Sequence, residues 1–504
     1  MKFEIRELGA IKYAECYLKD FNIICGKNNT GKTYATYALF GFLKSWKEIL
    51  VSTQETPIDI NTKILFKEGR LIIDLEDYYK SENNEKSVVE SFMDTLCDLY
   101  SRNLNEIFAS NKSRFKDSKF LVHLEKEDYD KMFSSPYQGS IGVPLYGEKI
   151  NDMNHLRINL EKDENSTNLI LSIAANLGDY DESKSSMNSL AIPETIIKFS
   201  IWTRIFSIIV NHALPEPYIS SAERTGIATF REDLDFARNR FIDMIQRHSR
   251  DGFKNFDLFD ILKSQIGEPD FNYPEAVNAN VEFLQQLESI KARDSYIYLE
   301  HNDILKLFLS ISDGSYEISN STIKYTLNKK KSIKLGIDEV SSSARAVLDL
   351  WFYLRHQAKP GDLLMIDEPE LNLHPENQRK LARLLASVSR AGIRVFITTH
   401  SDYIIRELNT LVLLHNRDES VFTNDILEHE GYSRQETLPY ESVQVYTSGL
   451  YSTRVPTKDG KRTRKSKINT LALSKVDQNG IYLDTFDDTI DKMNKIQDYL
   501  VWGE

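Results

Sequence analysis

The chain has 504 residues, of which 41% are hydrophobic and 27% charged, and its formal net charge is -12 at pH 7. This length predicts two or three lobes, the apolar content excludes global disorder, and the acidic balance argues against a surface that binds nucleic acid throughout, while leaving room for a local basic patch. Cys16, Cys25 and Cys97 are an odd number with no CxxC pair, which excludes a disulfide framework and a zinc cluster and fits a reducing cytoplasm.

The N-terminus and the longest apolar run both favour a soluble protein. The first residues, MKFEIRELGAIKYAE, carry charges throughout and lack the apolar stretch of a signal peptide. The apolar run at 194–214 contains Lys198 and Arg204, so it is typical of a buried helix rather than a membrane span. We therefore expect a soluble, cytoplasmic protein.

The first elements along the chain are predicted to be strands. KFEIREL and YAECYLKD alternate like paired strands, and FNIICG is a mainly apolar run. In the stretch that follows, Leu39, Leu43 and Trp46 recur at helical spacing, so a strand ends in a Gly-rich turn that opens a helix.

That turn reads GKNNTGKT and satisfies the pattern G-x-x-x-x-G-K-[ST] completely. In this pattern the backbone N–H groups and glycines surround phosphates, the lysine reaches the β- and γ-phosphates and the Thr binds Mg²⁺. We predict a nucleotide site formed by Gly26, Lys27, Asn28, Asn29, Thr30, Gly31, Lys32 and Thr33, with ATP and Mg²⁺ as ligands.

The middle of the chain carries weaker patterns. Residues 85–135 and 195–300 look mainly helical, and residues 140–180 combine strand-like runs with polar turns. No heptad repeat is sustained, so we expect no long coiled coil.

Strands and helices alternate again from about residue 300. Residues 328–334 are typical of a hairpin turn, and Ser341, Ser342 and Ser343 then precede an amphipathic helix, where serine is a frequent helix cap. LLMIDEP, a helix at 375–392 and the strand IRVFITTH follow. This order predicts a parallel sheet covered on both faces.

Two acidic residues and a histidine end these strands. Asp367 is placed to hold Mg²⁺, and Glu368 to orient and polarise the attacking water. His400 ends the next strand, where it could contact the γ-phosphate, although a lone histidine is more often structural. We predict Glu368 and His400 as catalytic residues, and Thr33 and Asp367 as metal ligands.

The C-terminal section alternates like a strand pair joined by a basic loop. Its cations are Arg454, Lys458, Lys461, Arg462, Arg464, Lys465 and Lys467. Such a run is commonly a solvated loop, and the alternative is a salt-sensitive contact with nucleic acid or an acidic protein.

In this order, GKNNTGKT, SSSAR, IDEPELNLHP and TTHS resemble the ABC-type ATPase heads of the SMC family. The resemblance implies an α/β P-loop NTPase of ABC/SMC head type, with a mixed sheet flanked by helices, a large mostly helical insert and a C-terminal α+β section. It also implies that Ser341–Ser343 bind the γ-phosphate held by a second subunit. Ser343 departs from the glycine usual there, which places the closest backbone approach in doubt.

Three further residues have no secure role. Gln54 lies in a polar turn suited to the glutamine loop of such ATPases. Glu223 and Arg224, in YISSAERTGI, could face the nucleotide or a dimer interface, or form a structural ion pair.

Residues 1–35 and 335–415 resemble the ATPases of bacterial anti-phage operons, of which those of the Septu and PARIS systems are the nearest named. This implies an ATPase that forms ATP-sandwich dimers or larger homo-oligomers and controls a separate nuclease or toxin effector. The alternatives are a DNA repair ATPase acting on DNA ends and a weakly hydrolysing scaffold. The ten histidines are scattered, and no second, nuclease site is predicted.

The expected organisation has four segments. They are an N-terminal ATPase lobe at 1–80, a mostly helical insert at 81–300, a C-terminal ATPase lobe at 301–430 and an extension at 431–504.

Overall fold

The structure, a computed structural model, describes residues 1–80, 86–144, 155–173, 194–231, 273–319, 322–328, 333–417, 421–456, 463–483 and 492–500. The chain divides into two compact units. The first unit contains Met1–Glu4, Phe42–Arg102 and Lys119–Pro215, and the second contains Ile5–Gly41, Asn103–Ser118 and Glu216–Glu504. The segments expected at 301–430 and 431–504 fall in the second unit, whereas the segment expected at 1–80 is divided between the two units, with Ile5–Gly41 in the second.

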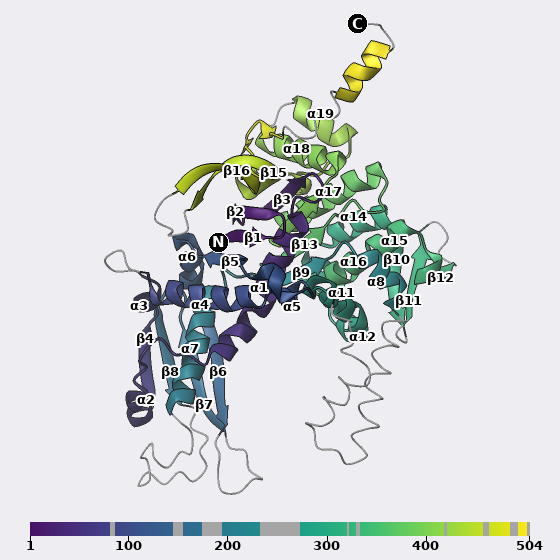
Figure 1. Ribbon diagram of the computed structural model, residues 1–504. Coiled ribbons are helices and arrows are strands. Elements are labelled where there is room, and N and C mark those ends of the chain that lie inside the picture. The colour runs from purple at the N-terminus through teal and green to yellow at the C-terminus, as the bar shows by residue number, and fades with distance from the viewer. Residues whose placement is uncertain are drawn as a thin grey trace, which may run out of the picture. The chain divides into compact units, whose positions relative to one another are not determined.

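A six-stranded sheet forms the centre of the second unit (Figure 1). Its order is β16 (Thr463–Leu473), β15 (Val443–Pro456), β3 (Phe21–Gly26), β14 (Arg394–Thr399), β13 (Leu363–Asp367) and β9 (Pro217–Ser220). Strands β15, β3, β14, β13 and β9 are parallel to one another, and β16 is antiparallel to β15. The sheet is mixed and the fold class is α/β, as the sequence predicted.

The central strands are mostly apolar, with Asn22 in β3 and Asp367 in β13 as exceptions, and they are fully buried. Every residue of β3 and β13 is buried, as expected of parallel strands in a sheet covered on both faces. Helices α17 (Pro375–Arg390), α18 (Asp402–Asn416) and α16 (Leu348–His356) contribute buried apolar residues to the core shared with these strands. The predicted strand–helix–strand order of this region is confirmed.

The C-terminal strand pair is also confirmed, and its position adds something the sequence did not indicate. β15 and β16 pair antiparallel over eleven residue positions, from Tyr446 opposite Leu473 to Pro456 opposite Thr463. On its other side β15 pairs in parallel with β3. A strand more than 400 residues from β3 in the sequence therefore extends the main sheet.

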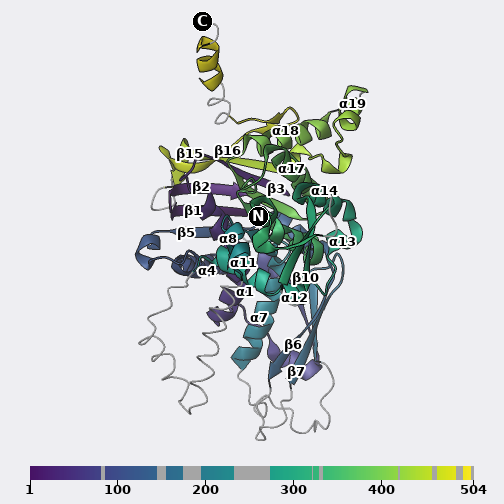
Figure 2. The same ribbon diagram turned by 90° about the vertical axis from the view of Figure 1, so that its right-hand side faces the viewer.

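Smaller elements complete the second unit. Strands β10 (Gly314–Ser319), β11 (Thr322–Leu327) and β12 (Lys334–Gly336) form an antiparallel sheet. β11 and β12 flank the hairpin turn predicted at 328–334, of which residues 329–332 lie outside the described residues. The remaining pieces are β1 (Lys2–Leu8, shared with the first unit), β2 (Ile11–Tyr17), α5 (Leu104–Ile107), η1 (Lys112–Phe115), α8 (Arg224–Thr229), α11 (Glu275–Gln285), α12 (Leu287–Ile290), α13 (Tyr296–Glu300), α14 (Asn302–Ser312), η4 (Ile337–Glu339), α15 (Ser342–Ala346), α19 (Val421–His429), η5 (Arg434–Glu436), η6 (Tyr440–Ser442), β17 (Val476–Asp477) and β18 (Gly480–Ile481). Figure 2, turned by 90° from Figure 1, also shows β15 and β16 together at one end of the six-stranded sheet.

The first unit is built on a four-stranded antiparallel sheet. Its order is β4 (Arg70–Asp74), β8 (Asn168–Ile173), β7 (His155–Lys162) and β6 (Tyr137–Pro144). The other elements are α2 (Thr62–Glu68), α3 (Glu76–Tyr79), α4 (Val88–Arg102), β5 (Lys119–His123), α6 (Lys126–Ser134) and α7 (Glu194–Val210), while α1 (Lys32–Thr53) runs into it from the second unit. The strand-like runs predicted between 140 and 180 correspond, where their residues are described, to β6, β7 and β8, which join β4 in one sheet.

Aromatic side chains fill the core of the first unit. Phe92, Trp202 and Phe206 contact one another with ring centroids 5.1–5.7 Å apart, within the range of favourable aromatic pairs. Trp202 belongs to the apolar run that carries Lys198 and Arg204, and the run forms the buried helix α7 as predicted.

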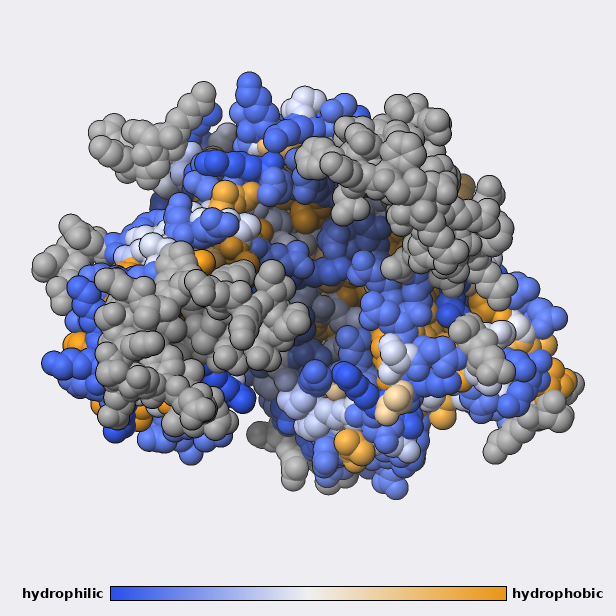
Figure 3. All heavy atoms as spheres, turned by 90° about the horizontal axis from the view of Figure 1, so that it is seen from below, coloured by the Kyte–Doolittle hydropathy of each residue, from blue (hydrophilic) through white to orange (hydrophobic). Residues whose placement is uncertain are grey.

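Among the described residues, no helix combines the length and apolar character needed to cross a bilayer. The face seen in Figure 3 is mostly hydrophilic where its residues are described, with apolar side chains in small groups. Small apolar groups of this kind are ordinary on protein surfaces.

Candidate functional site

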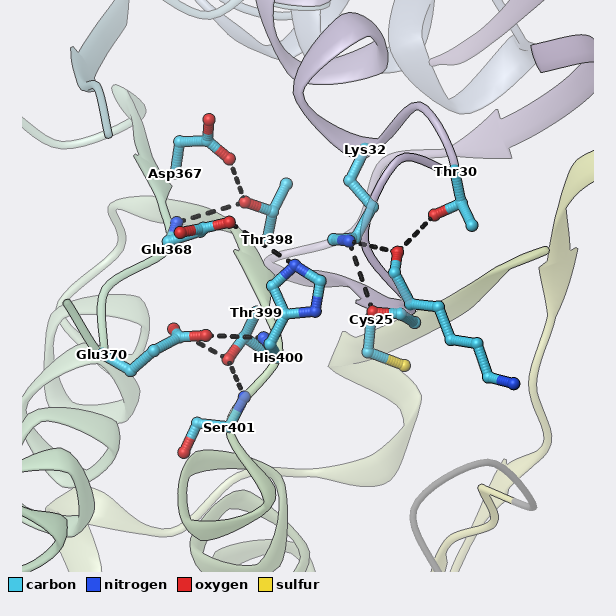
Figure 4. A network of polar contacts seen from close by, with 12 residues as sticks. Cys25, Thr30, Lys32, Asp367, Glu368, Glu370, Thr398, Thr399, His400 and Ser401 are labelled. Atoms are coloured by element: carbon cyan, nitrogen blue, oxygen red, sulfur yellow. Dashed lines mark hydrogen bonds and ion pairs between the residues drawn. The ribbon is translucent and has the colours of Figure 1, made fainter. Parts of the chain in front are cut away.

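Strand register brings the ends of β3, β13 and β14, where several predicted site residues lie, to one edge of the sheet. Cys25 lies opposite Thr399 on β14, and Asp367 lies opposite Thr398 on the same strand. On the other side of β3, Gly26 lies opposite Ser448 of β15. Because these strands are parallel, their carboxyl ends share an edge, which is where α/β sheets bind ligands. Figure 4 shows the side chains that meet there.

The loop between β3 and α1 has a backbone that depends on glycine at two positions. Gly26 has a φ of 133° and Gly31 a φ of 100°, and both values favour glycine. A Cβ on Gly26 would lie 2.5 Å from the carbonyl oxygen of Ser448, and one on Gly31 would lie 2.6 Å from the side chain of Ile11. Asn29 also has a positive φ, of 61°. The loop therefore has the strand–turn–helix context predicted for a phosphate-binding loop.

Lys32 folds back over this loop. Its Nζ donates to the carbonyl oxygens of Gly26, at 3.3 Å, and Lys27, at 2.9 Å (Figure 4). The residue is only 5% exposed. Burial lowers the pKa of Lys32, and the nearby carboxylates of Glu368 and Asp367 raise it part of the way back. An ammonium group held by neutral carbonyls beside an acidic strand end is suited to receive an anion.

The C-terminal strands support the loop through contacts that no sequence motif predicted. Thr30 Oγ1 donates to the Lys27 carbonyl at 2.7 Å and lies 2.6 Å from Ser448 Oγ, which donates to the Cys25 carbonyl at 3.0 Å. On β16, Asn469 donates to the carbonyl oxygens of Thr30 and Ala10. β15 and β16 thus hold the loop from the side opposite β14.

Asp367 is buried at the end of β13 and is only half satisfied. Its Oδ1 accepts a hydrogen bond from Thr398 Oγ1, whereas its Oδ2 is buried and has no hydrogen-bond partner among the described residues. Burial raises the pKa of this carboxyl to about 6, against the lowering effect of the nearby Thr398 and Thr33 hydroxyls. A buried carboxylate oxygen left without a partner costs free energy unless something binds it.

A carboxylate with a neighbouring hydroxyl is an oxygen donor set that Mg²⁺ accepts. The unpartnered Oδ2 of Asp367 and the nearby Thr33 hydroxyl therefore fit the ion predicted for this site.

Glu368 has a strained backbone and a histidine partner. Its φ is 53°, an uncommon value for a residue with a side chain, and such outliers cluster at functional sites. His400 Nε2 lies 3.4 Å from Glu368 Oε1. This hydrogen bond is the largest cause that holds the pKa of Glu368 below its ordinary value. Glu368 is therefore an ionised, half-buried carboxylate at neutral pH.

Glu370 fixes the end of β14, a role that the sequence reasoning missed. Its two carboxylate oxygens accept hydrogen bonds from the His400 backbone N–H, at 2.5 Å, and from Thr399 Oγ1, at 2.9 Å (Figure 4). These contacts aim His400 toward Glu368. The signal in the sequence was a third acidic residue after Asp367 and Glu368, three positions past the end of β13.

Ser341–Ser343, called the serine turn below, begin helix α15, as predicted. Ser341 is the N-cap, and its Oγ accepts a hydrogen bond from the Ala344 N–H at 3.2 Å and lies 2.9 Å from Ser343 Oγ. Ser341 and Ser342 are exposed, and Ser343 is partly exposed. These hydroxyls are accessible to a ligand or a partner from outside.

Glu223 and Arg224 make separate contacts, and each reaches a different part of the site. Tyr37 of α1 donates to Glu223 at 2.9 Å. The Arg224 guanidinium donates to backbone carbonyls of Ser221, Ala346, Asp367 and Glu368. The preceding strand, β9, lies in a region that the sequence indicated as mainly helical, and it pairs directly with β13.

The other predicted residues do not join this edge. Gln54 is exposed, directly follows α1 with a φ of 52°, and belongs to the first unit. Arg454, Arg464, Lys465 and Lys467 are exposed on β15 and β16, whereas Lys458, Lys461 and Arg462 lie outside the described residues. Arg454 lies opposite Lys465 in the strand pair, so like charges meet there.

The comparisons with known proteins identify one family. The family model described as AAA ATPase domain (AAA_15) matches residues 1–405. No curated protein matches the chain.

Among solved structures, similar chains include an Smc head bound to the C-terminal winged-helix domain of ScpA, with 11% identity, coverage of 93% of this chain and 98% of that one, and a TM-score of 0.33. An Smc head with an extended coiled coil, bound to the C-terminal domain of ScpA from Pyrococcus furiosus, has 11% identity, 98% coverage of both chains and a TM-score of 0.32. The SMC head domain from Thermotoga maritima has 10% identity, 94% and 98% coverage and a TM-score of 0.27. Similarities of this size carry no inference about mechanism.

Proposed function

The chain belongs to the AAA ATPase domain family, and from this premise we propose that its second unit binds and hydrolyses ATP at the edge formed by β3, β13 and β14. The observation that carries the proposal is the unpartnered Oδ2 of Asp367, buried at the strand end beside the phosphate-binding loop. Buried polar groups normally find partners, so this oxygen is explained best by a ligand that the chain binds.

The loop and Lys32 bind the phosphates of ATP in this proposal. The loop offers backbone N–H groups and the N-terminus of α1, where the helix dipole favours an anion. Lys32 Nζ exchanges its contacts with the Gly26 and Lys27 carbonyls for phosphate oxygens. Thr33 and Asp367 hold Mg²⁺, which when bound neutralises charge on the β- and γ-phosphates.

Glu368 acts on water. Its carboxylate accepts a hydrogen bond from a water molecule and aims the water oxygen at the γ-phosphorus, so that the new P–O bond forms as the bond to the ADP oxygen breaks. His400 keeps Glu368 ionised and oriented through the contact at 3.4 Å. The proton of the attacking water passes to Glu368 or to the released phosphate.

We further propose that the site is completed by a second copy of the chain. The exposed Ser341 and Ser342, at the start of α15, offer hydroxyl donors to the γ-phosphate held by a partner's loop. ATP then joins two chains, as the resemblance of SSSAR to an ABC signature turn implies.

The wider role we propose is control of a separate nuclease effector in anti-phage defence. Its support is the resemblance of residues 335–415 to the ATPases of such operons. Direct action on DNA is a second candidate, favoured by the exposed cations Arg454, Arg464, Lys465 and Lys467 on adjacent strands. Stimulation of ATP turnover by DNA, lost at high salt or when these four cations are changed to Gln, would favour the second candidate.

Light scattering and ATP turnover, measured on the same samples of wild type and Glu368→Gln, test the hydrolysis and the assembly together. We expect Glu368→Gln to reduce turnover at least 100-fold while ATP and Mg²⁺ trap a dimer or larger assembly. Glu317→Gln, which changes an exposed glutamate on β10, serves as the control and should behave as wild type. Full turnover in Glu368→Gln would contradict the role of Glu368. An assembly state that does not change with ATP in any variant would contradict a site completed by a second copy of the chain.

A further inference from the structure

We propose that Arg224 is a positioning residue that couples the nucleotide edge of one site to the serine turn offered to the other. The inference rests on the proposed function and extends it, because it concerns how the two sites of an assembly communicate. It follows from where the four hydrogen bonds of one guanidinium group end.

Those bonds join three separate segments of the second unit. Arg224 Nη1 donates to the Asp367 carbonyl at 2.8 Å, and Nη2 donates to the Glu368 carbonyl at 2.8 Å. Nε donates at 2.8 Å to the carbonyl of Ala346, the last residue of α15, and Nη1 also donates to the Ser221 carbonyl at 3.0 Å, just after β9. A single planar group thus ties the residues that act on ATP to the helix that begins with the serine turn.

The environment of Arg224 shows that this link is buried. Arg224 is 4% exposed, and a buried cation is costly unless it is paired and hydrogen-bonded. The carbonyl dipoles supply the hydrogen bonds, and the buried carboxyl of Asp349, on the helix after α15, interacts with its charge. Loss of the carbonyl contacts would leave the buried guanidinium without hydrogen-bond acceptors, so the three segments are held together by more than packing.

The neighbouring residue connects the same point to the phosphate-binding helix. Glu223 accepts a hydrogen bond from Tyr37, one turn into α1 after Lys32 and Thr33. The pair Glu223–Arg224 therefore contacts both α1 and the end of β13. A displacement of α1 or of the end of β13 on ATP binding would therefore act on Glu223 or on Arg224 directly.

The short length of α15 makes it responsive. The helix spans only Ser342–Ala346, so a displacement of its last carbonyl is passed to the serine turn at its other end. Arg224 also holds the carbonyl of Glu368, whose φ of 53° needs support from its surroundings. ATP binding at one site would in this way set the serine turn for the other.

The chain provides a matched control arginine. Arg345 Nη1 donates to the carbonyls of Ile337, Asp338 and Val340, which all lie in the segment directly before α15. Arg345→Lys therefore weakens comparable bonds to carbonyls without cutting a link to β13. Arg224→Lys keeps the charge but replaces a planar fork by a single ammonium group, which cannot reach both sides of the link.

Hydrogen exchange measured by mass spectrometry tests the coupling directly. Exchange in residues 337–347 is followed with and without ATP and Mg²⁺, in the full chain diluted until light scattering reports a monomer. We expect ATP to change this exchange at least threefold in wild type and in Arg345→Lys, and less than 1.5-fold in Arg224→Lys, while Arg224→Lys binds ATP within threefold of wild type. In the assembled protein, the Hill coefficient of turnover should fall toward 1 in Arg224→Lys alone.

Several outcomes would overturn the coupling. One is an exchange response in Arg224→Lys equal to that of wild type. Another is a parallel loss of ATP affinity and thermal stability in Arg224→Lys, which would show a purely structural role. If wild type binds and hydrolyses ATP without any change in 337–347, the coupling fails while the proposed function stands; if wild type does not bind ATP, both fail.

Discussion

The two ends of strand β13 carry an aspartate each, and the contrast between them separates a site from a merely buried carboxyl. Burial raises the pKa of both Asp362, just before the strand, and Asp367, at its end, to about 6. Asp362 Oδ2 accepts hydrogen bonds from the Lys359 N–H at 2.9 Å and the Tyr353 hydroxyl at 3.3 Å. Asp367 Oδ2 has no hydrogen-bond partner among the described residues. A perturbed pKa alone therefore does not distinguish the two aspartates; what distinguishes Asp367 is the unpartnered Oδ2 together with the nearby charges of Lys32 and Glu368.

The same contrast extends along the carboxyl edge. At its centre, Asp367, Glu368 and Lys32 have charged atoms that a ligand could engage. On its flanks, Arg224 and Asn469 spend their donors on backbone carbonyls. We infer that the central residues act on the substrate and that the flanking residues hold them in place.

The largest expected effect is on ATP turnover, which should depend on Asp367 but not on Asp362. Asp367→Asn should reduce ATP turnover at least 100-fold, because the variant lacks the carboxylate that we propose as a Mg²⁺ ligand. Asp362→Asn should leave turnover within twofold of wild type, because Asn keeps an oxygen acceptor for Lys359 and Tyr353. Steady-state phosphate release at saturating ATP and Mg²⁺ measures both, and equal losses in the two variants would remove the distinction.

The second effect concerns stability without ATP. The folded-state pKa of Asp367 lies above that of an unfolded aspartate, so its contribution to stability is present at low pH and is lost as pH rises through about 6. Asp367→Asn should therefore raise the free energy of unfolding at pH 7.5 by on the order of 1–2 kcal/mol, and the gain should shrink toward pH 5. Adding ATP and Mg²⁺ should reverse the order, since only wild type gains from the ligand. Thermal unfolding across pH 5–8 measures this; a lower stability of ligand-free Asp367→Asn at pH 7.5 would be inconsistent with the carboxylate being held ready for a cation.

A third, smaller effect tests the flank next to the loop. Ser448→Ala removes the hydroxyl that contacts Thr30 and the Cys25 carbonyl. The loop then loses support but no ligand contact, so ATP affinity should fall about three- to tenfold, corresponding to about 1 kcal/mol for one hydrogen bond. Ser452→Ala, an exposed position four residues along the same strand, is the matched control for equilibrium titration with a fluorescent ATP analogue. An unchanged affinity in Ser448→Ala would show that β15 does not position the loop.

The contribution of Ser448 also shows which part of the site could not be predicted from the sequence. The residues at the centre of the site were predicted from local patterns. Apolar runs predicted buried strands, and residues 26–33 and Asp367–Glu368 follow such runs directly. The flanks depend on register between segments far apart in the sequence. Nothing local to Ser448 indicates that its strand pairs with β3, and nothing in YISSAERTGI shows that β9 lies beside β13 or that the Arg224 donors end on backbone carbonyls. Glu370 was missed because its partners are a backbone N–H and a threonine hydroxyl about 30 residues away.

The smallest effect concerns the amino end of β13, where burial acts without function. Asp362 is partly exposed and its carboxylate is hydrogen-bonded, so Asp362→Asn should raise the free energy of unfolding at pH 7.5 by only about 0.5–1 kcal/mol, less than the roughly 1.4 kcal/mol per pKa unit that full burial would give. The sign follows as for Asp367, because a raised folded-state pKa means stability lost as pH rises through about 6. The gain should therefore vanish near pH 5. Unlike the gain in Asp367→Asn, it should persist unchanged when ATP and Mg²⁺ are added, since Asp362 contacts neither. Thermal unfolding with and without the ligand measures the difference, and a gain in Asp362→Asn that disappears with ATP would tie the amino edge of the sheet to the site.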